Sequence, residues 1–141
     1  MFERILVPTD GSRAVERAVE VGLRMASTDG ATVHALFVVE TREEWDFAVE
    51  RREREGERAV EAVEGRGDEL GVPVIKAFRY GLPHEEIVDY ADAHGIDLVV
   101  VGSHGRTGFG RFVHAGSVAE HVVRRSRVPV LVVRGEPRSS E

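Results

Sequence analysis

Two kinds of hydrophobic pattern alternate along the chain. Five short runs are mostly or wholly apolar, as expected for parallel strands that are covered on both faces. These predicted strands are residues 2–8, 32–39, 72–78, 96–101 and 128–133. Between them, apolar residues recur every three or four positions, which is the spacing of one helix face. The predicted helices are residues 13–27, 43–70, 84–93 and 117–126, and the second is either one long helix or two short ones, because Gly56 is a weak point within it.

This alternation of strands and helices predicts the fold class. We expect an α/β domain with a single open five-stranded parallel sheet, right-handed crossovers and about four helices on its two faces, as in flavodoxin-like and Rossmann-like folds. The domain is expected over residues 1–135, followed by a polar tail at 136–141. Ligands of such sheets bind beyond the carboxyl ends of the strands, where the strand order reverses. If the first and fourth strands are neighbours, the order is 3-2-1-4-5.

The end of the first predicted strand carries one half of the candidate chemistry. Pro8, Thr9 and Asp10 follow the apolar run, and Ser12 is placed to be the N-cap of the next helix. Asp10 either caps that helix together with Ser12 or contacts a ligand. We favour ligand contact, because with a 3-2-1-4-5 order Asp10 would lie beside the loop that follows the fourth strand.

The loop after the fourth strand carries the other half. Four glycines, Gly102, Gly105, Gly108 and Gly110, are followed by Gly116-Ser117, where a helix is expected to begin. Glycine lets the backbone approach a ligand closely, and consecutive N–H groups in such a loop form a concave anion site next to a helix N-terminus. The alternative is that these glycines only make a tight connection.

Composition narrows the function classes. The chain has 141 residues, no cysteine and a formal net charge of −6, so disulfides, thiol catalysis and cysteine-bound zinc are excluded and duplex binding is not expected. No apolar run approaches the length of a membrane span, and the strand pattern begins at once, so we expect no signal peptide and a cytoplasmic location. The charged segment from Glu50 to Arg58 is interpreted as a solvated helix face rather than a partner site.

Three common nucleotide-binding and catalytic motifs do not occur in the sequence. It contains no G-x-x-x-x-G-K-[ST] sequence, no G-x-G-x-x-G after the first strand and no G-x-S-x-G elbow. The six histidines are scattered, and His114 with His121 lacks an evident third ligand, so no metal site is predicted.

Four segments together resemble the universal stress protein family. They are Ile5-Leu-Val-Pro-Thr-Asp-Gly-Ser12, Val101-Gly-Ser-His-Gly-Arg-Thr-Gly108, Gly116-Ser117 and Val128-Pro-Val-Leu-Val-Val133. The likeness extends over nearly the whole chain, and its specific part is the glycine loop with the Gly-Ser pair. It implies an adenine-nucleotide-binding domain, often a homodimer, in a family whose members either bind ATP or do not.

The resemblance also implies roles for particular residues. Pro8, Thr9 and Asp10 would meet the adenosine end, with Asp10 accepting from a ribose hydroxyl, and Val39 would pack by its backbone against adenine. The residues expected around the phosphates are Gly102, His104, Gly105, Arg106, Gly116, Ser117 and Val118. Ser117 would add a hydroxyl that could touch a bound Mg²⁺.

One feature departs from the ATP-binding pattern of the family, G-x2-G-x9-G-[ST]. Ten residues separate Gly105 from Gly116 here, and the additional residue adds up to about 3.5 Å of chain. ATP, or another adenine nucleotide with or without Mg²⁺, is the expected ligand. The alternatives are a nucleotide-free dimerisation module and a slow ATPase. A binding protein is favoured over an enzyme. Pro129 favours an edge position for the last strand, so Val128 to Val133 is the expected homodimer contact.

Overall fold

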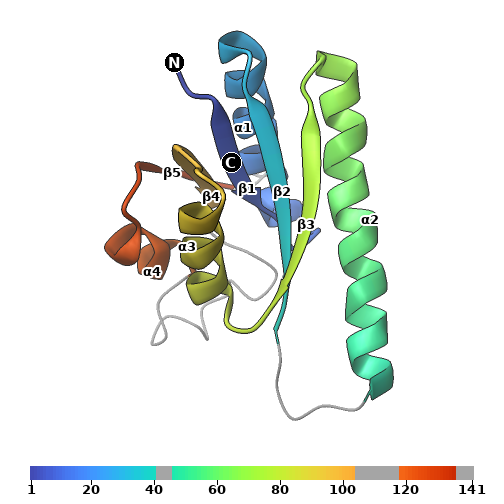
Figure 1. Cartoon of the computed structure of the whole chain (residues 1–141). Coiled ribbons are helices and arrows are strands. Elements are labelled where there is room, and N and C mark those ends of the chain that lie inside the picture. The colour runs from blue at the N-terminus through green and yellow to red at the C-terminus, as the bar shows by residue number, and fades with distance from the viewer. Residues whose placement is uncertain (41–45, 104–117, 136–141) are drawn as a thin grey trace, which may run out of the picture.

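The fold is an α/β sandwich around one parallel sheet (Figure 1). The computed structural model describes residues 1–40, 46–103 and 118–135. The strands are β1 (Arg4–Pro8), β2 (Thr32–Val39), β3 (Val74–Tyr80), β4 (Leu98–Gly102) and β5 (Val130–Val133). The helices are α1 (Glu16–Asp29), preceded by the 3-10 turn η1 (Arg13–Val15), then α2 (Asp46–Leu70), α3 (Pro83–Ala93) and α4 (Val118–Arg125).

The strand order confirms the sequence prediction. The sheet runs β3-β2-β1-β4-β5, and all four pairings are parallel. β1 lies between β2 and β4, with Ile5 opposite both Val33 and Leu98. Connections therefore proceed outward in opposite directions on the two sides of β1, and the carboxyl ends of β1 and β4 meet at the reversal point.

Two hydrophobic layers lie on the two faces of the sheet. Side chains alternate along each strand, so in β1 the residues Ile5 and Val7 pack under α1 and α2, whereas Leu6 packs on the opposite face with α3 and α4. All three are fully buried. Figure 1 shows the same division, with α1 and α2 on one side of the strands and α3 and α4 on the other.

Several predicted boundaries move by a few residues. Pro83 occupies the first turn of α3, where its missing N–H is not needed, so this helix begins one residue earlier than expected. β5 begins at Val130 rather than 128, because Ser126 Oγ accepts from the Val128 N–H and closes a turn before the strand. Ser12 has the extended backbone of an N-cap but makes no side-chain capping bond.

The interpretation of Gly56 as a weak point is wrong. α2 passes through Gly56 without interruption over 25 residues. A Cβ built on Gly56 would lie 2.7 Å from ring carbons of both Phe37 and Phe78, whose rings pack against each other at 5.8 Å. Glycine is therefore required here because the helix backbone approaches two aromatic rings of the sheet.

Candidate functional site

The candidate site lies at the carboxyl ends of β1 and β4. These strands are parallel neighbours, with Ile5 opposite Leu98 and Leu6 opposite Val99. The segment Pro8–Asp10 leaves β1 at the same edge of the sheet at which Gly102 and Ser103 leave β4. The structure thus brings together the two strand ends that carry the candidate chemistry.

The turn after β1 is held by its own side chains. The Thr9 N–H donates to the Leu36 carbonyl at 2.9 Å, which extends the pairing with β2. Thr9 Oγ1 accepts from the Gly11 N–H at 3.1 Å, and Asp10 Oδ1 accepts from the Ser12 N–H at 2.9 Å. Gly11 has φ +79°, a conformation that favours glycine. Asp10 therefore makes a local hydrogen bond within the turn, but Ser12 makes no side-chain capping bond with it.

At the carboxyl end of β4, Gly102 and Ser103 are held against β5. Gly102 is paired with Val133, and the Ser103 N–H donates to the Val133 carbonyl at 2.9 Å. Gly102 and Ser103 are both half-buried at this edge. At the far end of the connection, Val118 is the first residue of α4 and is 39% exposed. The predicted phosphate residues His104, Gly105, Arg106, Gly116 and Ser117 lie outside the described residues.

Val39 is placed on the opposite face of the sheet from α4. Its side chain is fully buried in the layer under α1 and α2, and its carbonyl accepts from the Gly81 N–H at 3.0 Å. The preceding residue, Val38, packs with the layer that includes α3 and α4. Val38 is thus the side chain at the end of β2 that shares a face with α4. The two-residue alternation could have separated the two valines, but only once the helices on each face were known.

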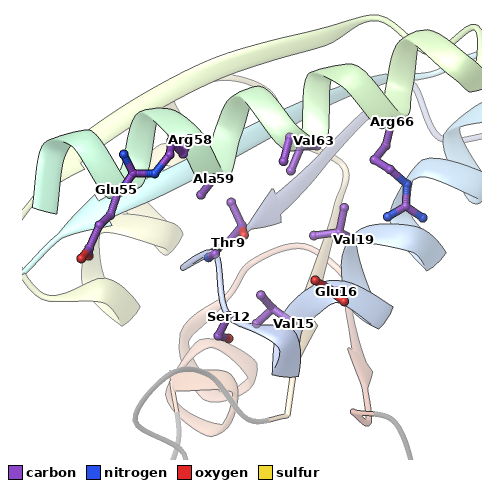
Figure 2. A pocket seen from close by; sticks show the side chains of 12 residues that line it. Thr9, Ser12, Val15, Glu16, Val19, Glu55, Arg58, Ala59, Val63 and Arg66 are labelled. Carbon is purple, nitrogen blue, oxygen red and sulfur yellow. Dashed lines mark hydrogen bonds between the residues drawn. The ribbon is translucent and has the colours of Figure 1, made fainter.

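A pocket of about 390 Å³ opens beside the turn after β1, between α1 and α2 (Figure 2). This volume is within the range of small-molecule sites. The lining residues are Thr9, Gly11, Ser12, Val15, Glu16, Val19, Glu55, Arg58, Ala59, Ala62, Val63 and Arg66. Charged side chains of both signs stand among small apolar ones. Sequence reasoning did not find the α2 part of this pocket.

Two polar features of this pocket are defined by contacts. Arg66 forms an ion pair with Glu20 of α1, so its charge is compensated across the helix pair. The Ser12 hydroxyl is buried and makes no hydrogen bond within the described part of the chain. Two acidic side chains, Glu16 and Glu55, and two basic ones, Arg58 and Arg66, line the pocket, so its charges are balanced.

The charged segment from Glu50 to Arg58 is more than a solvated face. Arg52 donates to the carbonyl of Glu40 at 3.1 Å, and Glu53 accepts from the Tyr80 hydroxyl at 2.6 Å. That hydrogen bond, assisted by burial, raises the pKa of Tyr80 above its usual range. These two hydrogen bonds connect the first half of α2 to the ends of β2 and β3.

Comparisons with known proteins decide the family. The model of the universal stress protein family matches residues 1–134. The chain belongs to the universal stress protein family. Universal stress protein MJ0531 of Methanocaldococcus jannaschii is 33% identical over 142 residues, which cover 95% of this chain and 83% of the relative. The family assignment made from the four segments is confirmed.

Solved structures of universal stress proteins share the fold. The structure of protein MJ0577 from the same archaeon superposes with a TM-score of 0.84 at 31% identity, covering 98% of this chain and 99% of that one. A universal stress protein in complex with cAMP has a TM-score of 0.80 at 23% identity, covering 96% and 99% of the two chains. One from Archaeoglobus fulgidus in complex with dAMP has a TM-score of 0.73 at 20% identity, covering 94% and 98%. The last two show likeness of fold.

Proposed function

We propose that this universal stress protein binds an adenine nucleotide, with ATP as the expected form, at the carboxyl ends of β1 and β4. The observation that carries the proposal is the meeting of the Asp10 turn with the Gly102–Ser103 exit at the point where the strand order reverses. The cAMP and dAMP complexes of the same fold show that other proteins of this architecture accommodate adenine nucleotides.

Each part of the nucleotide has proposed contacts. Asp10 is assigned to a ribose hydroxyl, because it stands at the end of β1 next to β4. The end of β2 is assigned to the base, through the Val39 backbone or the Val38 side chain. Phosphates are assigned to backbone N–H groups from Gly102 onward and to the start of α4 at Val118, with His104, Gly105, Arg106, Gly116 and Ser117 between them. Ser117 is the assigned Mg²⁺ neighbour.

Ligand-induced stabilisation tests the proposal directly. A ligand at 100 times its Kd stabilises the folded state by about 2.7 kcal/mol. For a domain of this size, that raises the melting temperature by roughly 8–10 °C. We expect Mg·ATP to produce such a shift. An unchanged melting temperature at millimolar nucleotide would instead support the nucleotide-free module, an alternative that the ten-residue spacing between Gly105 and Gly116 leaves open.

Substitution of Asp10 separates sugar binding from turn formation. Asp10→Asn keeps an acceptor for the Ser12 N–H but removes the charge, whereas Asp10→Ala removes both. We expect Asp10→Ala to weaken nucleotide binding by about tenfold or more, the effect of one charge-assisted hydrogen bond. Asp92→Ala, an exposed position on α3, is the matched control and should bind like the wild type. Equal affinity of Asp10→Ala and the control would remove Asp10 from the site.

The residue at the centre of the glycine loop provides a second test. Gly105→Val would place a side chain in the space assigned to phosphate, so we expect binding to be abolished while the protein stays folded. Unchanged affinity would show that this loop does not hold the phosphates.

We further propose that the protein is a homodimer that pairs through β5. β5 is an edge strand with β4 as its neighbour, and Leu131 and Val132 are 36% and 40% exposed. An apolar edge strand is a template for another chain. Leu131→Arg should convert the dimer to a monomer in light scattering. Ile75→Arg, at the 47% exposed position on the opposite edge strand β3, is the control and should leave the mass unchanged.

The proposed role is regulatory rather than catalytic, within a cytoplasmic stress response. Any hydrolysis of ATP is expected to be far slower than the typical enzyme turnover of about 10 s⁻¹. Rapid phosphate release by the purified protein would instead favour a catalytic role over a regulatory one. Within the described parts of the chain, no helix is long and apolar enough to cross a membrane.

A further inference from the structure

A buried histidine connects the sheet to the end of α3. His34 of β2 is 5% exposed, and its Nδ1 lies 2.7 Å from the hydroxyl oxygen of Tyr90. Tyr90, 2% exposed, meets the His34 ring edge-on and stacks on the ring of His94 at a centroid distance of 3.9 Å. His94 is the C-cap residue of α3. The three rings therefore form a continuous contact from β2 to the last turn of the helix.

Arg79 of β3 completes this cluster. Its Nη2 lies 3.0 Å from His94 Nε2, and its guanidinium lies over the Tyr90 ring, 5.1 Å from the centroid. A guanidinium only donates hydrogen bonds, so Nε2 of His94 must accept. An accepting Nε2 requires a neutral ring with its proton on Nδ1. We call His34, Arg79, Tyr90 and His94 the α3 histidine cluster.

The charges that face His34 disfavour its protonation. Burial lowers the pKa of His34, a proton on the neighbouring His94 ring would lower it further, and the charge of Arg4 on β1 acts in the same direction. Asp97 is directed to the backbone of β1, where its carboxylate accepts from the N–H groups of Glu3 and Arg4. Burial raises the pKa of Tyr90, which stays neutral. The folded state thus holds His34 uncharged under conditions in which an unfolded chain would protonate it.

We propose that the α3 histidine cluster is a pH-dependent contact between α3 and the sheet. Near neutral pH it keeps the carboxyl end of α3 packed on β2 and β3 (the closed state), and on acidification this end of the helix separates from the sheet (the open state). Protonated His34 would place a charge in the core, where the nearby Arg4 is also positive. This cost is relieved when the last turn of α3, which carries Tyr90 and His94, moves away from the sheet.

The direction and size of the effect follow from proton linkage. The open state binds a proton at the ordinary histidine pKa of about 6.5, whereas the closed state resists it. The closed state is therefore fully favoured above pH 6.5 and loses stability as the pH falls below that value. One histidine that is protonated only in the open state multiplies the opening constant by up to about eightfold between pH 7 and pH 5.5.

Hydrogen exchange at the end of α3 tests this inference. Protection of the backbone amides of residues 90–96, corrected for intrinsic exchange rates, should fall several-fold from pH 7 to pH 5.5 in the wild type. In the double variant His34→Gln and His94→Gln, amide oxygens replace the accepting ring nitrogens without a titrating group, and the protection should not depend on pH.

Two further measurements keep the test decisive. In the variant His84→Gln, at the other end of α3, the amide protection should keep the wild-type pH dependence. The His84 ring stacks on His121 of α4 and is not part of the cluster. An NMR titration of the wild type should give a His34 midpoint below 6.5, whether or not the double variant folds. A His34 midpoint at or above 6.5, or equal pH dependence in the wild type and the double variant, would overturn the proposal.

Discussion

Replacing Gly56 by alanine provides a sharp test of how α2 packs on the sheet. In an isolated helix this change would stabilise by about 1 kcal/mol, because alanine has the higher helix propensity. In this fold the new Cβ would lie 2.7 Å from ring carbons of Phe37 and Phe78. That distance is about 0.8 Å or more shorter than a normal carbon–carbon contact. Phe37 is 5% exposed and lies within the core cluster, so its ring cannot move without displacing packed neighbours.

The same helix supplies a matched control. Gly65 also lies within α2, and a Cβ built on it meets no atom within 4 Å. Both alanine substitutions gain the same helix-propensity term, so this term cancels in the comparison. Overpacking of a well-filled core costs about 1–3 kcal/mol. We therefore expect Gly56→Ala to be about 1–3 kcal/mol less stable than Gly65→Ala, and Gly65→Ala to exceed the wild type by up to about 1 kcal/mol.

Urea unfolding at 25 °C, followed by circular dichroism, measures both variants under the two-state assumption. The expected order of midpoints is Gly65→Ala above the wild type, and Gly56→Ala below Gly65→Ala. If the two variants unfold at the same urea concentration, the close approach of α2 to the two phenylalanine rings does not constrain the helix, and the packing argument fails.

Two further predictions concern side chains near the turns. Ser12→Ala should leave the free energy of unfolding within about 0.5 kcal/mol of the wild type or raise it, because the hydroxyl makes no cap bond; a loss of about 1 kcal/mol or more in urea unfolding would restore the capping role. Asp97→Ala should lower the melting temperature through a loss of about 1 kcal/mol, since its carboxylate accepts from two backbone N–H groups; a result equal to the Asp92→Ala control would contradict this.

The topology could be predicted from the sequence for a physical reason. Runs such as Leu98–Gly102 lack polar positions on either face, which is typical of short strands covered on both sides. The strand order is inferred from the candidate ligand-binding residues. Asp10 and Gly102 lie at the ends of two different strands, and both can contact one ligand only if these strands are neighbours. The structure places both residues at the meeting ends of β1 and β4.

Features that depend on distant contacts could not be predicted in this way. From the local sequence, Gly56 predicts a weak point in the helix. The structure shows instead that glycine is needed there because the rings of Phe37 on β2 and Phe78 on β3 lie against the helix backbone. Val38 and Val39 are indistinguishable until the helices on each face are known. The α2 side of the pocket depends on which turn of a 25-residue helix faces α1, and a mostly charged sequence contains little information on that rotation.

The turn after β1 has a consequence for any ligand that reaches it. Thr9 and Asp10 each bind an amide of their own loop, so this corner of the sheet acquires its shape when the chain folds. A molecule that docks there meets a preorganised surface, and little conformational freedom remains to be lost on association. Affinity at this corner is then governed by the contacts themselves and only weakly by reordering of the backbone.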